Sequence, residues 1–487
     1  MTKPTTQPVE TNPADGHPAD DRIRPHHLRA IIILLFAVFV VLLNETTMNM
    51  AVEVMINDPD LGIDQRGAAW LTTAFLLTMA VVIPSTGWLQ QRFTTRQLFG
   101  LSTVSFTIGA VIAFLSPGFA VLVVGRVVQA FGTAIAMPLL MSTVMEVVPA
   151  HRRGRMMGLV SMVISVAPAL GPVVSGLVLE TMSWRALFGI MIPIGLAVVL
   201  VGAKWIPNVN ELGERPRLDI LSLPLAAVGF GGTVYGLSSI GNSDLPSWVL
   251  PAALVAGGIG LIVFVIRQLR LARTGEPLLD VRVFRNGRFT VPVVLMMLAM
   301  MGMFGVLIML PLLLQRSFGM APLEVGLLML PGSLLTGLLG PVVGNAYDRI
   351  GPRPLVIPGT AVAAAAFGLL FFVTAETPTW YFLMFHILLS IGLALTFSPT
   401  FTSALGSLPH HQYGHGSASL STAQQVAGAA GNSGFVSIMS IGIASATAAG
   451  MSDGAAMLAG AHTAFLFAAI VQVIVFGLAW FVRRPVD

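Results

Sequence analysis

The sequence predicts an all-α polytopic membrane protein, and composition, hydropathy and run length all support this fold class. Of the 487 residues, 55% are hydrophobic and only 10% are charged, whereas soluble globular chains carry about 25% charged residues. The mean hydropathy is +0.84. Several apolar runs reach the roughly 18 residues that span a bilayer as a helix. A membrane β-barrel would instead show alternating segments of about ten residues.

The apolar runs define fourteen predicted membrane spans. Several contain Pro and Gly, which membrane helices tolerate when neighbouring groups satisfy the freed backbone atoms. The spans are predicted at residues 29–52, 67–90, 98–115, 120–147, 156–179, 186–206, 219–240, 247–271, 289–315, 324–346, 355–375, 379–405, 414–446 and 458–482.

The cationic residues indicate how these spans are oriented. If the N-terminus is cytoplasmic, all 26 Lys and Arg residues fall in cytoplasmic segments except Arg66, Arg185, Arg316 and the intramembrane Arg126. Cytoplasmic loops of membrane proteins carry such an excess of Lys and Arg. We therefore expect a multi-pass protein of the cytoplasmic membrane with both termini inside. The first span follows a polar segment without a signal-peptide pattern, so we expect that span to be retained.

An internal repeat divides the chain into halves. The segments Gly87–Arg96 and Gly344–Arg353 share the spacing of Gly, Arg and Arg, and they lie 257 residues apart. They follow the second and tenth spans, so spans seven and eight become an insertion between two six-helix halves. Paired halves with a substrate site between them are typical of transporters. The predicted domains are a disordered cytoplasmic tail (1–28), an N-terminal bundle (29–206), two inserted helices with a basic linker (207–288), a C-terminal bundle (289–482) and a short tail (483–487).

Glu45 is the candidate proton carrier. It lies in the first span within the polar cluster Asn44-Glu45-Thr46-Thr47-Met48-Asn49, and an ionisable residue at this depth indicates a functional site. Arg126, in the fourth span, is expected at a similar depth. Desolvation raises the pKa of a carboxyl group, and a nearby cation lowers it. Glu45 beside Arg126 could therefore load and release a proton. A static buried ion pair joining two helices is the alternative.

Other polar or adaptable side chains are candidates for a substrate cavity. They are Asn44, Asn49, Gln129, Met301 and Gln424. Methionine is common at surfaces that accept varied apolar molecules, while structural hydrogen bonds and core packing are the alternatives. The lone His386 in the twelfth span is interpreted as a satisfied core histidine rather than a second proton site.

Several classes of function are excluded by what the sequence lacks. It has no cysteine and only two lysines, Lys3 and Lys204, neither of which follows a phosphate-binding loop. It also lacks HExxH and GxSxG patterns. The cluster His410, His411 and His415 has no acid or cysteine nearby to complete a metal site, so we interpret these histidines as part of a solvated loop. We therefore expect no enzyme activity, cofactor or metal. We also expect no nucleic-acid partner, because the arginine-rich loops of a membrane protein set its topology and contact anionic lipids.

The fifth span carries small residues at helical spacing. Ala167, Gly171 and Ser175 recur every four residues, and this allows a neighbouring helix to approach closely. The neighbouring Pro168 and Pro172 would bend the helix. At the cytoplasmic end of the fourth span, Glu146 is placed to pair with Arg92 or Arg155, and simple exposure at the membrane interface is the alternative.

Three motifs together give a family resemblance over about residues 29–482. Arg126-Val-Val-Gln-Ala-Phe-Gly132 resembles the fourth-span motif of the major facilitator superfamily, and Ala167 to Gly176 is similar to its antiporter motif. Gly87 to Arg96 resembles its loop motif, with Gln91 where that motif usually carries Asp. The chain is thus similar to the fourteen-helix drug:proton antiporters, and within them to the lincomycin-resistance-type branch.

The resemblance implies a monomeric bacterial inner-membrane exporter that exchanges protons for lipophilic or cationic small molecules. It implies proton coupling by Glu45 and Arg126. A dedicated exporter of one metabolite, such as an amino acid, a lipid or a self-made antibiotic, is the alternative. The implied cytoplasmic latch consists of Gly87, Arg92, Arg96, Glu146, Asp348, Arg349 and Arg353. The implied helix-packing hinge consists of Pro168, Gly171, Pro172 and Gly176.

Overall fold

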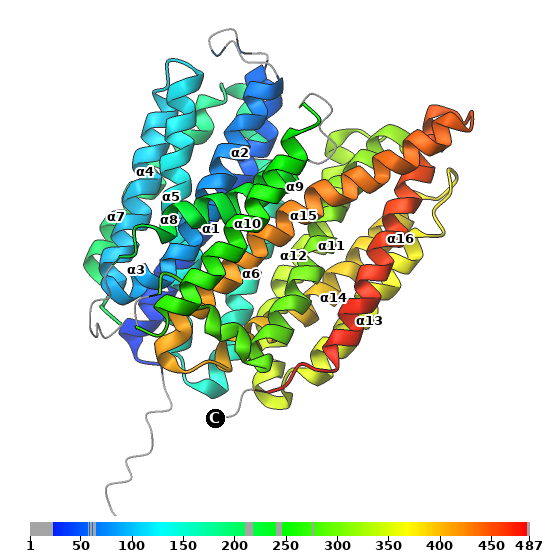
Figure 1. Ribbon diagram of the computed structural model, residues 1–487. Helices are drawn as coiled ribbons and strands as arrows, with labels where there is room; N and C mark the ends of the chain where they lie inside the picture. The colour runs from blue at the N-terminus through cyan, green and yellow to red at the C-terminus, as the bar shows by residue number, and fades with distance from the viewer. Residues whose placement is uncertain are drawn as a thin grey trace, which may run out of the picture.

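The computed structural model describes residues 23–484 except 57, 59–60, 62–64, 210–217, 240–245 and 275–276. Within these residues the regular secondary structure is entirely helical. Long helices run side by side in one bundle (Figure 1). The predicted tail at 1–28 lies largely outside the described residues, and α1 already begins at Pro25.

The N-terminal half is a bundle of long apolar helices. A 3₁₀ turn at Ile83–Ser85 joins its second and third helices into one span, because Pro84 has no N–H to donate to the preceding turn. The next helix begins with a reciprocal cap between Thr94 and Gln97. The helices are α1 (Pro25–Ile56), α2 (Gln65–Val82), α3 (Thr86–Arg92), α4 (Thr95–Phe114), α5 (Phe119–Val147), α6 (Arg153–Thr181) and α7 (Arg185–Trp205).

The inserted region is a close helix pair. Its first member is interrupted: α8 (Ser222–Ala226), the π-helical η3 (Ala227–Gly231) and α9 (Gly232–Ser238) follow one another and pack on α10 (Val249–Leu271). The backbones of Gly229 and Gly260 meet with no room for side chains, since a Cβ on Gly260 would lie 2.7 Å from the Gly229 nitrogen.

The C-terminal half has the same plan. Its first helix follows the 3₁₀ segment η4 (Val281–Arg285), is capped by the Asn286 side chain, which accepts from the Arg288 nitrogen at 3.0 Å, and ends at Gly319 with φ 65°. The helices are α11 (Gly287–Phe318), α12 (Pro322–Ile350), α13 (Arg353–Leu370), α14 (Thr379–Gly406), α15 (Tyr413–Ala448) and α16 (Asp453–Ala479).

Thirteen of the described helices are long and apolar enough to cross a membrane. The predicted span at 219–240 is not among them, because its apolar helix covers only Ser222–Leu237 and includes the π-helical turn. The prediction of a polytopic helical bundle is confirmed, whereas the count of fourteen spans remains a prediction.

The two halves meet at one end of the bundle, which we call the cationic end. It comprises the α3–α4, α5–α6, α12–α13 and α14–α15 connections, which carry Arg92, Arg96, Arg152, Arg153, Arg155, Arg349 and Arg353. Here α6 packs along α12, and α15 passes beside α3 before running toward the opposite end (Figure 1).

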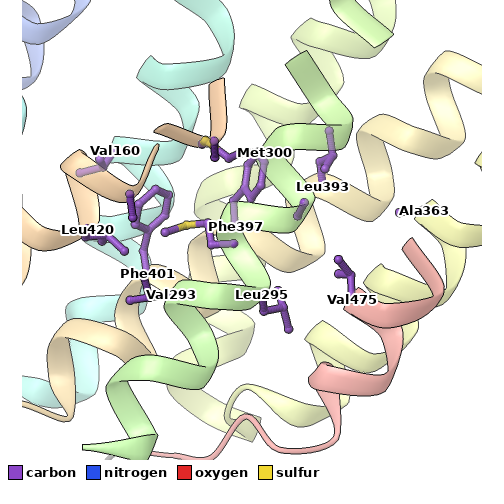
Figure 2. Packing of buried hydrophobic residues seen from close by; sticks show 14 of the residues in the cluster. Val160, Val293, Leu295, Met300, Ala363, Leu393, Phe397, Phe401, Leu420 and Val475 are labelled. Carbon is purple, nitrogen blue, oxygen red and sulfur yellow. The ribbon is translucent and has the colours of Figure 1, made fainter. Parts of the chain in front are cut away.

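The main hydrophobic core is continuous across this contact. Phe397 and Phe401 of α14 lie among Val293 of α11, Leu420 of α15 and Val160 of α6 (Figure 2). Because Val160 belongs to the N-terminal half, this one core holds both halves together.

Candidate functional site

Glu45 lies in α1, and no described side chain pairs with its carboxylate. It is neither fully buried nor exposed, and among the described residues it makes no hydrogen bond and no ion pair within 4.0 Å. Its charge nevertheless interacts with that of Arg126 on α5. The structure therefore brings the two predicted residues together without the closed ion pair that a purely structural role would favour.

Arg126 is held by a polar network that joins α5 to α1. Its Nη1 donates to Oε1 of Gln129 at 3.1 Å, and Nε2 of Gln129 donates to Oδ1 of Asn44 at 3.3 Å. The guanidinium carbon lies 4.2 Å from the ring centroid of Phe75 on α2, a favourable cation–π position. Two donors, Nε of Arg126 and Nδ2 of Asn44, are buried without a partner in the described chain, so the network keeps unused hydrogen-bonding capacity beside Glu45.

The small residues of α6 pack directly on the polar cluster of α1. A Cβ on Gly171 would collide with Oγ1 of Thr46, so only glycine permits this approach. Ser175 donates from Oγ to the carbonyl of Thr47 at 3.2 Å. Of the predicted hinge residues, Pro168 lies half-buried nearby, whereas Pro172 and Gly176 are exposed and a Cβ on Gly176 would meet nothing within 4 Å.

The predicted cavity residues separate into two groups. Asn44 and Gln129 are fully buried, so they belong to the α1–α5 contact and not to an open substrate surface in this structure. Met301 and Gln424 are partly accessible, on α11 and α15. The side chain of Asn49 lies outside the described residues.

One predicted latch residue, Asp348, bridges the two halves. Its carboxylate at the end of α12 accepts from the backbone nitrogens of Gly154 at 2.7 Å and Arg155 at 3.0 Å. These are among the first amides of α6, where the helix dipole favours an anion. Beside this contact, Gly344 and Gly154 approach too closely for a side chain on either.

The first copy of the loop motif makes the equivalent contact with α15. The Gln91 side chain lies 2.7 Å from Nε2 of His415, and Nδ1 of His415 accepts from the backbone nitrogen of Asp280 at 3.2 Å. The 2.7 Å contact joins the amide nitrogen Nε2 of Gln91 to Nε2 of His415. The sequence analysis treated His415 as part of a solvated loop, and this was wrong: it is 2% exposed.

The other predicted latch residues are placed around these contacts. A Cβ on Gly87 would collide with His415, so this glycine permits the α3–α15 approach. Arg96 instead donates to the Ala203 carbonyl of α7, and Arg353 donates to the Val482 carbonyl at 3.0 Å, so both bind within their own half. Arg92 is half-buried, while Glu146 and Arg349 are exposed at the cationic end.

A second repeat, not noticed in the sequence analysis, explains this symmetry. Pro149, His151, Gly154 and Arg155 are matched 260 residues later by Pro409, His411, Gly414 and His415. Asp348 contacts the first segment and Gln91 the second, so the two copies of the loop motif make exchanged contacts with opposite halves. The spacing was visible in the sequence, although the contacts were not.

A cavity among the described residues forms a groove away from Glu45. It has a volume of about 610 Å³ and lies between α1 and α7 near the cationic end, lined by Arg29, Ile32, Phe36, Val201 and Trp205 among others. Its mostly apolar, exposed lining fits contact with lipid tails and not a central substrate site.

Comparison with known proteins identifies the family. The sequence profile of the Major Facilitator Superfamily matches residues 34–432. The chain belongs to this superfamily. It is therefore a multi-pass membrane transporter acting on small molecules, and not an enzyme.

Relatives within the superfamily carry names of resistance proteins. The chain is 40% identical to the lincomycin resistance protein LmrB of Listeria monocytogenes, over 95% of this chain and 98% of that protein. It is 36% identical to LmrB of Bacillus subtilis, over 93% and 95% respectively. The multidrug resistance protein B homolog of Mycobacterium tuberculosis is 28% identical, over 87% of this chain and 79% of that protein.

Solved structures of the superfamily share the fold. The human organic anion transporter MFSD10 superposes with a TM-score of 0.64 at 15% identity, over 94% of this chain and all of that chain. The proton:xylose symporter XylE gives a TM-score of 0.63 at 15% identity, over 94% and 96%.

Proposed function

We propose that this chain is a proton-driven efflux transporter that exports lipophilic or cationic small molecules in exchange for protons. It would act as a monomer in the bacterial cytoplasmic membrane, with fourteen spans, both termini inside, and the cationic end facing the cytoplasm. The observation that carries the proposal is the Glu45 carboxylate within a membrane-spanning helix: no described residue pairs with it, and the buried charge of Arg126 acts on it. The names of the resistance-protein relatives support the substrate class.

Exchange follows from competition at one carboxylate. When ionised, Glu45 attracts a cationic compound, and when protonated it does not, so the proton and the compound exclude each other electrostatically. The buried guanidinium of Arg126 stabilises the ionised form and so allows the proton to leave. The Gln129 and Asn44 side chains hold that guanidinium at a fixed position.

Alternating access requires the halves to separate at the cationic end. There the contacts of Asp348 with α6 and of Gln91 with His415 would open when the compound enters from the cytoplasm. The structure thus corresponds in this proposal to the state closed toward the cytoplasm. The Gly171–Thr46 contact couples α6 to the segment that carries Glu45.

Ethidium efflux from cells expressing the chain tests the proposal. We expect a protonophore to abolish efflux and Glu45→Gln to reduce it at least about tenfold, equivalent to about 1.4 kcal/mol. Glu180→Gln, an exposed acid on α6, is the matched control and should leave efflux intact. Full efflux by Glu45→Gln would contradict the mechanism, and protection against only one compound in a panel with lincomycin would favour a dedicated exporter.

A further inference from the structure

A short non-helical segment between α10 and η4 is buried. It comprises Pro277 to Asp280, and we call it the strap. Leu278, Leu279 and Asp280 are 1%, 2% and 4% exposed, and Pro277 has no backbone N–H. Connecting segments usually run over the surface, because their backbone groups need water or other partners. A buried strap therefore needs hydrogen-bond partners from the helices around it.

Two side chains accept the three backbone N–H groups of the strap. Oε1 of Gln268, on α10, accepts from the nitrogen of Leu278 at 2.8 Å and from that of Leu279 at 3.2 Å. Nδ1 of His415, on α15, accepts from the nitrogen of Asp280 at 3.2 Å. The strap is thus bound to the inserted helices at its beginning and to the C-terminal half at its end.

The Gln268 amide is itself held in one orientation by α8. The side chain is 0% exposed, and its Nε2 donates to Oγ of Ser222 at 2.6 Å. Oγ of Ser222 donates in turn to Oδ2 of Asp219 at 2.5 Å, and Asp219 pairs with Arg267. Because Nε2 is engaged on this side, Oε1 is directed toward the strap.

The strap lies where the inserted helices and the two halves meet. Its leucines, Leu278 and Leu279, belong to one hydrophobic cluster that includes Phe264 of α10, Trp88 of α3 and Ala418 of α15. Because α3 belongs to the N-terminal half and α15 to the C-terminal half, a displaced strap would disturb the contact between the halves.

We propose that Gln268 is a positioning residue of the closure at the cationic end. By holding the strap, it places the Asp280 N–H against Nδ1 of His415, whose Nε2 contacts Gln91 at 2.7 Å. The inserted helices thereby stabilise the closed state. Without the Gln268 acceptor, two buried N–H groups would lose their partner and the strap would shift to find another. This inference rests on the proposed opening of the cationic end and assigns the inserted helices a part in it.

A distance between two nitroxide labels, one in each half, measures the closure. The chain has no cysteine, so Gly100→Cys on α4 and Gly477→Cys on α16 would carry the only labels. A Cβ on either glycine would meet nothing within 4 Å. Both lie near the cationic end, since Gly100 follows the start of α4 and the chain beyond α16 contacts Arg353.

Double electron–electron resonance on the labelled full-length chain in nanodiscs gives the ratio of closed to open protein, with and without ethidium. Gln268→Met keeps the length of the side chain and removes its amide oxygen. We expect it to lower this ratio at least about fivefold, the effect of roughly one hydrogen bond. A residue that only stabilised the fold would lower the unfolding temperature and leave the ratio unchanged.

A matched pair of substitutions at Asp280 isolates the contact with His415. Asp280→Pro removes the N–H that His415 accepts, and the φ of −75° at this position already suits proline. Asp280→Ala loses the same carboxylate and keeps the N–H, so it is the control. We expect the ratio of closed to open protein to be lower for Asp280→Pro than for Asp280→Ala, again at least about fivefold.

The results separate this inference from the proposed proton exchange. If Gln268→Met keeps the ratio of the unmodified chain, or if Asp280→Pro matches Asp280→Ala, the positioning role is refuted while proton exchange stands. The Asp280 pair decides alone where Gln268→Met does not fold. If ethidium leaves the ratio of the unmodified chain unchanged and efflux survives a protonophore, the proposed function is refuted instead.

Discussion

The Gln91 side chain of α3 lies 2.7 Å from Nε2 of His415 on α15, in the position that mirrors the contact of Asp348 with α6. One closure of the cationic end is therefore a contact between neutral groups, and the other is an anion at a helix N-terminus. Both depend on glycines, Gly87 and Gly154, that admit no side chain.

The closure beside Gln91 can be trapped by a disulfide bond. A Cβ on Gly414 would lie 3.3 Å from Cβ of Gln90, close to the separation of bridged cysteines, and the chain has no cysteine of its own. We expect Gln90→Cys with Gly414→Cys to oxidise readily and to stop ethidium efflux, with recovery under dithiothreitol. Each single substitution serves as a control. Full efflux by the oxidised pair would show that this end need not open.

The Gly171–Thr46 contact should be sensitive to a single methyl group. Gly171→Ala forces its Cβ into Oγ1 of Thr46, and overpacking of this kind costs about 1–3 kcal/mol. We expect a lower thermal unfolding temperature in detergent and reduced efflux. Gly176→Ala, one turn and a half along the same helix, meets open space and should change neither. Equal behaviour of the two variants would mean that α6 is not tightly packed on α1.

Substitution of Gln129 should remove the hydrogen bond that holds the Arg126 guanidinium, while the charges of Glu45 and Arg126 remain. Gln129→Leu removes the acceptor of Arg126 and the donor to Asn44, leaving buried polar groups unpaired at about 1–3 kcal/mol. We expect efflux to fall at least about tenfold. Thr133→Val is the comparison, because Thr133 donates only to the carbonyl of Gln129 in its own helix. A similar small effect of both variants would contradict the role of the network.

The inserted helices should contribute stability that depends on pH. Asp219 accepts two hydrogen bonds of 2.6 Å from Arg267, and these bonds lower the pKa of Asp219 despite partial burial, with help from Ser222. Because the folded pKa is depressed, the stabilisation is present above the ordinary Asp value and is lost as pH falls through the folded value. Asp219→Asn should cost about 1 kcal/mol at pH 7 and progressively less below about pH 4.

Thermal unfolding at several pH values measures this difference. Glu376→Gln, an exposed acid, should match the unmodified chain throughout. A constant difference between Asp219→Asn and the unmodified chain down to the acid limit would show that the ion pair is not its source.

The fold could be predicted because a membrane-spanning helix is recognised from the apolar composition of a single segment. What escaped prediction depends on packing between segments: the apolar segment at 219–240 contains a π-helical turn at Ala227–Gly231, where Gly229 packs against the backbone of α10. Similarly, α1 begins at Pro25 and not at Arg29, since helical hydrogen bonding continues beyond the apolar run.

The charged residues of the site could be predicted from the sequence, whereas the contacts between helices could not. Glu45 and Arg126 stand out as ionisable residues within apolar runs, so sequence alone finds them. The Gln91–His415 contact joins residues 324 positions apart, and no local pattern reveals which surfaces of α3 and α15 meet. The burial of Asn44, likewise, depends on Gln129 of another helix.

The backbone of Asp280 donates to His415, so the linker behind the two inserted helices is part of the closure between the halves. Excising the insertion together with this linker (residues 207–288) to obtain a minimal transporter would remove the hydrogen-bond donor to the His415 imidazole. The inserted region is thus part of the closure between the halves. A shortened chain would need a new hydrogen-bond donor for His415 before the cationic end could close.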